Sequence, residues 1–378
     1  MPDSSSKMWS YYNPVDIRFG VETVTCLAEH IGKQRYALVT YDDQLFHDFA
    51  NRLYAEVGVA SCVIDNVQPN PDRGALAAQC ASLQSSDDGI DLIVALGGGS
   101  VIDTAKVLAT ASNGFDTVME YVFKGTGADT LSMTPLIAVP TTSGTGSEVT
   151  SWATIWDEKV GEKYSLSHPR LYPRTAIIDP SLMLGKSAEL TLATGLDALS
   201  HALESIWNKN ANPVSARYAV FAARTILCDL PKLLANPNDL ALRTSLAEAA
   251  LASGLAFSNT QTSLAHNLSY PVTLHYGVPH GIACSFTLPT ILKSVSDIGG
   301  LRGKALRQIF GADLVVGADI LAGCLRDMNV DLRFLDYGVI PSAAAEIIDA
   351  AFVGQRGRNF VGHKDNFLIA AQSGGLIS

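Results

Sequence analysis

The sequence has few charged residues, and acidic residues outnumber basic ones. Only 17% of its 378 residues are Asp, Glu, Lys or Arg, and the formal net charge is −10. A surface that binds nucleic acid needs clustered Lys and Arg to displace the counterions of phosphates. The composition therefore argues against a nucleic-acid partner, and the acidic balance mainly favours solubility.

The sequence also lacks a cysteine framework and a membrane segment. Its six cysteines include no CxxC pair, so we expect reduced thiols in the core of a cytoplasmic protein. No stretch reaches the roughly 18 uninterrupted apolar residues of a membrane helix, and the first fourteen residues contain no apolar signal region. These absences predict a soluble, unexported protein without a membrane anchor.

The apolar residues, 47% of the chain, follow two different patterns. Up to about residue 180, short β-branched runs are separated by a helix's length of chain, at residues 36–40, 61–65, 91–96, 135–139 and 172–180. Such runs predict a parallel sheet covered on both faces. Beyond residue 185 the segments are long and rich in Ala and Leu, which predicts helices. We therefore predict an α/β domain over residues 1–182 and an all-helical domain over residues 183–378.

The third apolar run leads into a glycine loop, GGGS at residues 97–100, and then into VIDTAK, which has helical character. Glycines allow the backbone to approach an anion closely, and the free N–H groups at a helix start meet its charge. The dinucleotide fingerprint G-x-G-x-x-G is not satisfied, because residue 102 is Ile. By itself this loop fits a tight turn as well as a phosphate site.

A second loop, TTSGTGSE at residues 141–148, follows the fourth run and is rich in hydroxyl groups and glycine. Two loops of this kind suit the two phosphates of a dinucleotide. Asp42, which follows the first run, has the chemistry to accept a hydrogen bond from a ribose 2′-hydroxyl and to repel a 2′-phosphate. This favours NAD over NADP, although Asp42 also suits a simple turn.

The segment at residues 193–206 places polar groups on one face of a predicted helix. At about 100° per residue, Asp197, His201 and Glu204 fall within about 60° of one another. No Lys or Arg lies in this segment, so the polar stripe is expected to be buried. An Asp and a His four residues apart are well spaced to chelate a cation, or to share a hydrogen bond in a core. Glu204 is a candidate either to orient His201 or to cap a neighbouring loop.

A second group of histidines favours the metal over the simple hydrogen bond. His266, His275 and His280 lie close together in a sequence with only eight histidines, and a GVP turn before His280 can direct its ring back toward the helix. One carboxylate and three imidazoles make a site suited to Fe(II) or Zn(II), with no thiolate to select zinc.

The succession of these motifs resembles the iron-containing, or group III, alcohol dehydrogenases. The resemblance covers nearly the whole chain, from FG at residues 19–20 through both loops, KY at 163–164, DP at 179–180 and GLDALSH at 195–201 to PHG at 279–281. It implies an NAD(P)-dependent alcohol dehydrogenase or aldehyde reductase that uses Fe(II) or Zn(II), acts on a small alcohol or aldehyde, and forms a homodimer. The implied fold is a dinucleotide-binding α/β domain followed by an all-helical, metal-binding catalytic domain, an architecture similar to that of dehydroquinate synthase.

The resemblance also assigns site residues. The metal ligands that it implies are Asp197, His201, His266 and His280. The cofactor-contacting positions that it implies are Asp42, Asn70, Gly97, Gly98, Gly99, Ser100, Asp103, Thr141, Thr142, Thr145 and Lys163.

The sequence departs from the family pattern at one position. Many members have a second histidine four residues after the third metal ligand, and here this residue is Tyr270. A proton relay must then use Tyr270, His275, a water molecule or the ribose hydroxyls.

Alternative functions remain open at this point. The stretches at residues 163–172 and 265–271 are similar to a phosphonoacetaldehyde-reducing subset of the family. A polyol-phosphate dehydrogenase or a dehydroquinate synthase-like lyase would need several Lys and Arg near the metal, and the ligand helix supplies none. A metal- and nucleotide-binding protein without turnover is the remaining alternative, since a fold alone does not prove activity.

Overall fold

The computed structural model describes residues 8–86 and 89–377. The expected absence of a signal region concerns the first fourteen residues, so it lies partly outside the described residues.

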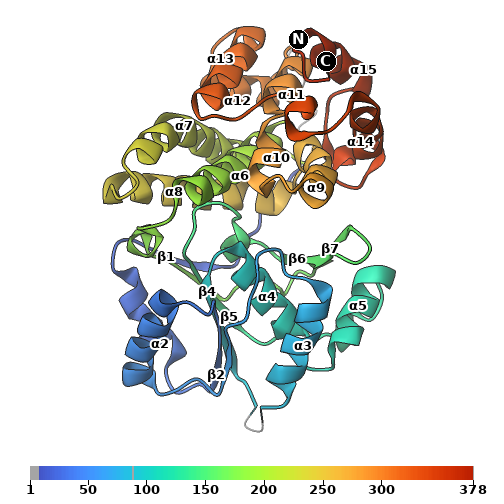
Figure 1. Cartoon of the computed structure of the whole chain (residues 1–378). Helices are drawn as coiled ribbons and strands as arrows, with labels where there is room; N and C mark the ends of the chain where they lie inside the picture. The colour runs from blue at the N-terminus through green and yellow to red at the C-terminus, as the bar shows by residue number, and fades with distance from the viewer. Residues whose placement is uncertain (1–7, 87–88, 378) are drawn as a thin grey trace. The chain divides into compact units, whose positions relative to one another are not determined.

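A six-stranded, fully parallel sheet carries the first half of the chain, with strand order β1-β8-β5-β4-β2-β3 (Figure 1). Its strands are β1 (Asp16–Phe19), β2 (Tyr36–Val39), β3 (Cys62–Ile64), β4 (Leu92–Gly97), β5 (Leu136–Pro140) and β8 (Thr175–Ile178). Each of the five predicted runs contains a strand, so the prediction of a parallel sheet is confirmed. The sequence did not predict β1, or the separate antiparallel hairpin of β6 (Trp152–Asp157) and β7 (Glu162–Ser167).

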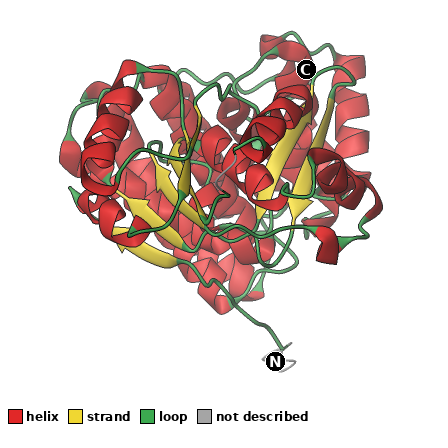
Figure 2. Cartoon of the chain, turned by 90° about the horizontal axis from the view of Figure 1, so that it is seen from below, coloured by secondary structure: helices red, strands yellow, loops and turns green. Residues whose placement is uncertain are grey.

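The central strand β4 shows how both faces of the sheet are covered. Ile93 and Ala95 belong to an apolar cluster with residues of α3 (Arg73–Gln84), α4 (Gly99–Thr110) and α5 (Phe115–Lys124). Leu92 and Val94 point the other way, into a cluster with α1 (Leu27–Ile31) and α2 (Gln44–Val57). Figure 2 shows helices on either side of the strands. A strand buried on both faces needs apolar side chains at successive positions, which explains its unbroken apolar run.

The rest of the described chain after β8 contains helices and no strand, which confirms the all-helical prediction. The α-helices are α6 (Ala188–Ile206), α7 (Pro213–Ala235), α8 (Leu240–Thr260), α9 (Leu264–Tyr276), α10 (His280–Ser285), α11 (Leu288–Ser294), α12 (Gly300–Phe310), α13 (Leu314–Asp327), α14 (Pro341–Val353) and α15 (Lys364–Ser373). Short 3₁₀ turns connect several elements at Thr23–Cys26, Ala128–Thr130, Ser147–Val149, Pro180–Met183, Phe334–Tyr337 and Gly357–Asn359.

Two compact units make up the chain, and both are discontinuous in sequence. The α/β unit comprises residues 14–195 and 229–254, and the helical unit comprises the described residues up to 13, residues 196–228 and the described residues from 255 onward. The sequence suggests a single boundary after residue 182. Residues 229–254 join the α/β unit because Ala247 and Leu251 of α8 pack against Ala176 and Ile178 of β8.

Helix α8 also has the length and composition of a membrane span, the one such single helix among the described residues. Just over half of its apolar window, 56%, is buried inside the protein. A core helix of a folded enzyme has the same composition, so packing accounts for its apolar residues and no membrane protein is indicated.

All six cysteines are free thiols, as expected, but their expected place in the core is only partly correct. Cys80 and Cys284 are buried, whereas Cys228 is exposed on α7. Composition alone therefore does not determine whether a given cysteine is buried.

Candidate functional site

The first candidate site is a group of polar side chains inside the helical unit. Asp197 and His201 lie on one face of α6, His266 lies on α9, and His280 is the first residue of α10; Figure 1 shows these helices next to one another. Oδ1 of Asp197 lies 3.7 Å from Nε2 of His201 and 3.4 Å from Nε2 of His266. The structure therefore brings together all four residues to which the sequence assigns the metal.

Asp197 Oδ1 and His266 Nε2 in this group are buried without a hydrogen-bond partner in the described part of the chain. A buried polar atom left unpaired costs roughly 1–3 kcal/mol, so such atoms are rare unless a ligand satisfies them. Both atoms belong to ligand types that bind divalent metals, and they face each other at 3.4 Å. The donor set fits a metal ion.

Glu204 fixes the orientation of His266. Its carboxylate accepts hydrogen bonds from the backbone N–H groups of Ser263, Ala265 and His266 at the start of α9, and from Nδ1 of the His266 ring at 2.6 Å. The ring therefore carries its proton on Nδ1, which leaves the lone pair of Nε2 for a metal. Of the two roles considered from sequence, capping a neighbouring segment is correct. The imidazole ring that Glu204 is seen to orient is that of His266.

The ring of His201 is held by stacking. It lies parallel to the ring of Phe257, with centroids 3.9 Å apart and an interplanar angle of 3°, and it also stacks on His266 at 4.5 Å and 22°. The rings of His266 and His280 instead meet nearly at right angles, at 5.4 Å and 74°. The sequence signal for His280 was the preceding turn, in which Gly277 adopts a φ of 69° and ends α9.

Neighbouring charges strongly perturb two groups of this site. Burial alone would raise the pKa of Asp197, but His201 and His266 hold that pKa well below its usual value. Burial disfavours the charged form of His266, yet the nearby Cys284 and Glu204 raise its pKa well above the usual value. The carboxylates of Asp197 and Glu204 thus favour positive charge within the group, and a bound cation can supply that charge in place of a ring proton.

A buried thiol also belongs to the cluster, and sequence reasoning missed it. One potential ligand atom each from Asp197, His266, His280 and Cys284 lie within 4.8 Å of one another. Sγ of Cys284 lies 3.6 Å from Nε2 of His280, four residues earlier on α10. The same i, i+4 spacing that identified Asp197 and His201 was the available signal for this pair.

The two candidate relay residues lie on different sides of α9. Tyr270 is four residues after His266, and its ring is nearly parallel to that of His280, at 6.1 Å and 11°. His275 is nine residues after His266, which at about 100° per residue places it on the opposite side of the helix, and it is exposed. Only Tyr270 of this pair lies against a ring of the cluster.

The second candidate site is formed by the two loops of the α/β unit. The glycine loop connects β4 to α4, whose N-cap is Gly98, so the loop leads into a helix start as predicted, and no side chain caps that start. A Cβ at Gly98 would lie 3.3 Å from Oγ1 of Thr142, and one at Gly99 would lie 2.5 Å from Cγ2 of Thr145. The glycines are therefore required because the two loops pack directly on each other. The N–H of Thr141 donates to the carbonyl of Gly97 at 3.0 Å and adds to this contact.

A fully buried lysine, Lys106, stabilises the loop at residues 141–148 through hydrogen bonds. Nζ of Lys106 on α4 donates to Oγ of Ser147, to both oxygens of Thr150 and to the carbonyl of Trp152, at 2.8–3.1 Å. Burial lowers its pKa to about 8. Asp103 acts beside it, since its two carboxylate oxygens accept hydrogen bonds from Ser147 Oγ and from the N–H of Thr154. This network supports the loop and was not predicted from sequence.

The remaining cofactor candidates lie near the ends of strands and on the hairpin. Asp42 follows β2 with a side chain 75% exposed, and its Oδ1 lies 3.1 Å from Nε2 of His47. Asn70 has a left-handed φ of 57°, and its N–H donates to Oγ of Ser100. Lys163 lies on β7, with Nζ 5.2 Å from the centre of the Trp156 ring.

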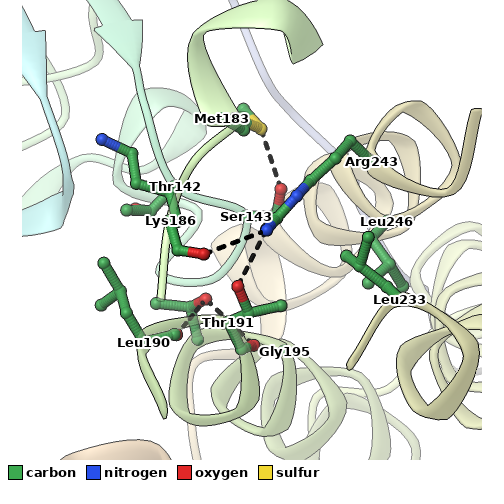
Figure 3. Close-up of a pocket in the computed structure, with 11 residues that line it drawn as sticks. Thr142, Ser143, Met183, Lys186, Leu190, Thr191, Gly195, Leu233, Arg243 and Leu246 are labelled. Atoms are coloured by element: carbon green, nitrogen blue, oxygen red, sulfur yellow. Dashed lines mark hydrogen bonds between the residues drawn. The ribbon is translucent and has the colours of Figure 1, made fainter. Parts of the chain in front are cut away.

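A pocket opens beside the second loop of the α/β unit (Figure 3). The guanidinium of Arg243 points toward it and donates to Oγ1 of Thr191 at 2.9 Å and to the carbonyl of Lys186. Thr142 and Ser143 line the same pocket. Sequence reasoning missed this pocket because its walls come from segments far apart in the chain.

Comparison with known proteins decides the family. Residues 14–180 match the iron-containing alcohol dehydrogenase family, and residues 191–363 match the C-terminal domain of the Fe-containing alcohol dehydrogenases. The chain belongs to this family. It is therefore a metal-dependent oxidoreductase that transfers hydride between a nicotinamide dinucleotide and a small alcohol or aldehyde, and its cofactors are iron and NAD.

Several relatives of this family are similar over most of the chain. The NAD-dependent methanol dehydrogenase of Bacillus methanolicus is 33% identical over 334 residues, 87% of this chain and 86% of that protein. The phosphonoacetaldehyde reductase of Streptomyces viridochromogenes is 38% identical over 238 residues, 61% of this chain and 59% of that protein. The crystal structure of sulfoacetaldehyde reductase from Bifidobacterium kashiwanohense with NAD⁺ has a TM-score of 0.88, with 28% identity, and covers 98% of this chain and 99% of that one.

Proposed function

We propose that Asp197, His201, His266 and His280 hold the iron of this dehydrogenase. The observation that carries this proposal is the pair of buried atoms without a hydrogen-bond partner in the described residues, Asp197 Oδ1 and His266 Nε2, which face each other at 3.4 Å. When bound, the cation supplies Lewis-acid polarisation of a carbonyl or alcohol oxygen. Glu204 keeps the His266 tautomer that presents Nε2.

We assign the proton exchange to the hydroxyl of Tyr270. Its ring lies beside that of His280, whereas His275 is exposed on the opposite side of α9. A tyrosine hydroxyl both donates and accepts, as a relay in a reversible reaction must. The pH profiles of turnover in Tyr270→Phe and His275→Ala test this assignment.

The dinucleotide is assigned to the loops of the α/β unit. The N–H groups that begin α4 and the hydroxyls of Ser100, Thr141, Thr142 and Thr145 suit a pyrophosphate. Asn70 and Lys163 are assigned to the same cofactor. Asp103 acts through Ser147 and positions the second loop, because both of its oxygens accept hydrogen bonds within the protein.

The preferred dinucleotide is NAD. Asp42 presents a largely exposed carboxylate at the end of β2, where it can accept from a ribose 2′-hydroxyl and repels a 2′-phosphate. The pocket that includes Thr142 and Arg243 adjoins this loop and is assigned to one end of the dinucleotide.

Acetaldehydes with an anionic group are a specific candidate for the substrate. Two relatives are named as phosphonoacetaldehyde and sulfoacetaldehyde reductases, and both names denote a two-carbon aldehyde with an anionic substituent. Uncharged short alcohols, such as the methanol named for another relative, are the competing class. We place the enzyme in the cytoplasm as a homodimer, in keeping with its free thiols and its family.

The test is NADH oxidation by the iron-loaded enzyme with a panel of aldehydes: phosphonoacetaldehyde, sulfoacetaldehyde, acetaldehyde and lactaldehyde. A kcat/KM for an anionic acetaldehyde at least tenfold above that for acetaldehyde would support the anionic class. Equal values, or a preference for acetaldehyde, would assign the enzyme to the uncharged substrates. Parallel measurements with NADPH test the proposed role of Asp42.

A further inference from the structure

A cavity lies in the helical unit, where α11 packs against both α13 and α15 (Figure 1). Its volume is about 220 Å³, and it opens to solvent. We propose that this cavity binds a small organic anion, a carboxylate on a short apolar or aromatic body. The residues that line it have no task in the metal centre or in the cofactor loops, so this inference goes beyond the proposed function and does not depend on it.

Small residues leave this space open. Ala318 and Ala322 on α13 are four residues apart and therefore lie on one face of that helix. Ala370 and Gly374, at the end of α15, have the same spacing and face the same cavity. Protein interiors are otherwise closely packed, so a space of this size needs side chains as small as these on two of its walls.

The apolar wall of the cavity is held in place by aromatic packing. The ring of Phe286 meets that of Phe334 at 5.1 Å and 89°, and that of Tyr337 at 5.0 Å and 50°. Pro289, in the first turn of α11, adds a rigid apolar surface beside it. A pocket whose walls are already ordered loses little conformational entropy when a ligand binds.

The hydroxyl of Thr290 points to a ligand. This residue lines the cavity and is only 8% exposed, yet its side chain makes no hydrogen bond to any described residue. Its Oγ1 lies 4.0 Å from the position of a Cβ built at Gly374, which lines the same cavity, so the hydroxyl is at the cavity wall. A buried hydroxyl without a partner is unfavourable, and a carboxylate oxygen of a ligand can accept its hydrogen bond.

Two basic side chains line the cavity without a partner. Lys293 follows Thr290 by three residues on α11, and Arg326 follows Ala322 by four residues on α13. Neither forms an ion pair with any residue that the structure describes. Asp319 is the one acidic residue among the described lining residues, and it leaves a single positive charge unbalanced. The charge of the cavity therefore favours an anion over a cation or a neutral molecule.

The volume determines the size of the ligand. An apolar cavity of about 150 Å³ holds one benzene ring, and pockets for drug-sized molecules begin at about 300 Å³. A cavity of about 220 Å³ therefore suits one aromatic ring or a short alkyl chain with a carboxylate near Lys293 and Arg326. Benzoate has this form and is the probe for the test.

The test is calorimetric titration of the iron-loaded enzyme with benzoate, and with benzylamine as a ligand of similar shape and opposite charge. We expect one saturable benzoate site per chain and at least tenfold weaker binding of benzylamine. Ala322→Leu fills the cavity, so it should weaken benzoate binding at least tenfold while NADH oxidation with an aldehyde is unchanged. Gly323→Ala is the matched control, because it adds volume on the same helix where no heavy atom lies within 4 Å of the new Cβ.

Charge variants test the polar part of the site without changing its packing. Lys293→Gln and Arg326→Gln should each weaken benzoate binding about threefold, and Asp319→Asn should strengthen it about twofold, because these charges are near solvent and partly screened. Lys304→Gln is the control, since Lys304 is exposed on α12 and does not line the cavity. These variants decide the matter if Ala322→Leu does not fold.

Three results would overturn the proposal. They are an absence of saturable benzoate binding in the wild type, equal affinities for benzoate and benzylamine, and an unchanged benzoate affinity in folded Ala322→Leu. Benzoate bound at the metal centre instead would keep its affinity in Ala322→Leu and compete with the aldehyde. A failure of this inference is therefore distinguishable from a failure of the proposed metal centre, which would appear as lost iron binding.

Discussion

The two candidate sites of this protein are built on opposite principles. In the α/β unit, the loops offer backbone N–H groups and hydroxyls, and their geometry depends on the absence of side chains at Gly98 and Gly99. In the helical unit, the cluster offers carboxylate and imidazole groups, and Glu204 orients the imidazole of His266. The first site should be sensitive to added volume, and the second to lost charge. Changes of each kind should damage one function and spare the other.

The largest effect is expected for His266→Ala. The substitution removes a ligand and takes the nearest imidazole from the buried carboxylates of Asp197 and Glu204, so metal content and turnover should fall below detection. NADH affinity, measured by fluorescence titration, should change by less than about threefold. Exposed His363, at the N-cap of α15, provides the control His363→Ala, which should keep both properties. Equal loss of NADH binding and metal would show that the two sites are not independent.

A smaller effect on the same site is expected for Glu204→Gln. The two carboxylate oxygens accept hydrogen bonds from three backbone N–H groups and from the His266 ring. The glutamine amide has the same shape but only one acceptor oxygen, so some of these donors lose their partner. Metal affinity should fall roughly 10- to 100-fold, as for other groups that orient a metal-bound imidazole. Chelator competition measures this change. Unchanged metal affinity would mean that Glu204 only caps α9.

The loop site is tested by Gly99→Ala, which adds volume without charge. The new Cβ would lie 2.5 Å from Thr145, and such overpacking costs about 1–3 kcal/mol. We expect NADH affinity to fall at least about fivefold while bound metal is unchanged. Gly323→Ala is the matched control, because no heavy atom lies within 4 Å of a Cβ built there. Normal NADH binding by Gly99→Ala would show that the loops separate without cost.

The smallest effect concerns a buried carboxyl of the α/β unit. Burial raises the pKa of Glu148 from 4.5 to about 7. A raised folded-state pKa gives stability that is present below pH 4.5 and is lost as the pH rises through about 7. The contribution of Glu148 to the free energy of unfolding should therefore fall as the pH rises from about 4.5 to about 7.5, and Glu148→Gln should lack this part of the pH dependence. Urea denaturation at both pH values gives the free energy of unfolding of the wild type and of Glu148→Gln. An equal change of this free energy with pH in the two proteins would contradict the prediction.

The contrast between the two sites also explains which of their residues could be predicted from the sequence. The loops are continuous motifs, and each predicted strand was found because its residues are neighbours in the chain. The ligand group was recognisable because Asp197 and His201 share one helix face. Cys284 was not recognised, since a cysteine among apolar residues has the pattern of a core residue. The partner of Glu204 lies 62 residues away, and only the packing of α6 against α9 reveals it.

Contacts between segments far apart in the chain could not be predicted from sequence patterns either. Lys106 lies on a helix whose other charged residue is Asp103, and its acceptors are 41 to 46 residues further along the chain. Strand β1 was missed because its four residues alternate between half-buried and exposed, without an apolar run. Arg243 contacts Thr191 across 52 residues. Sequence periodicity predicts which face of a single helix or strand is buried. It does not predict which helices and strands pack against one another, and these contacts depend on that packing.

The central claim is that hydride transfer requires the metal cluster, whereas dinucleotide binding does not. The most direct measurement compares metal-stripped and Fe(II)-reconstituted enzyme in two assays, NADH binding by fluorescence titration and NADH oxidation with a small aldehyde. Our account predicts that stripped enzyme binds NADH normally, oxidises none, and recovers turnover in proportion to bound iron. Aldehyde reduction by enzyme with no detectable metal, or loss of NADH binding on stripping, would contradict it.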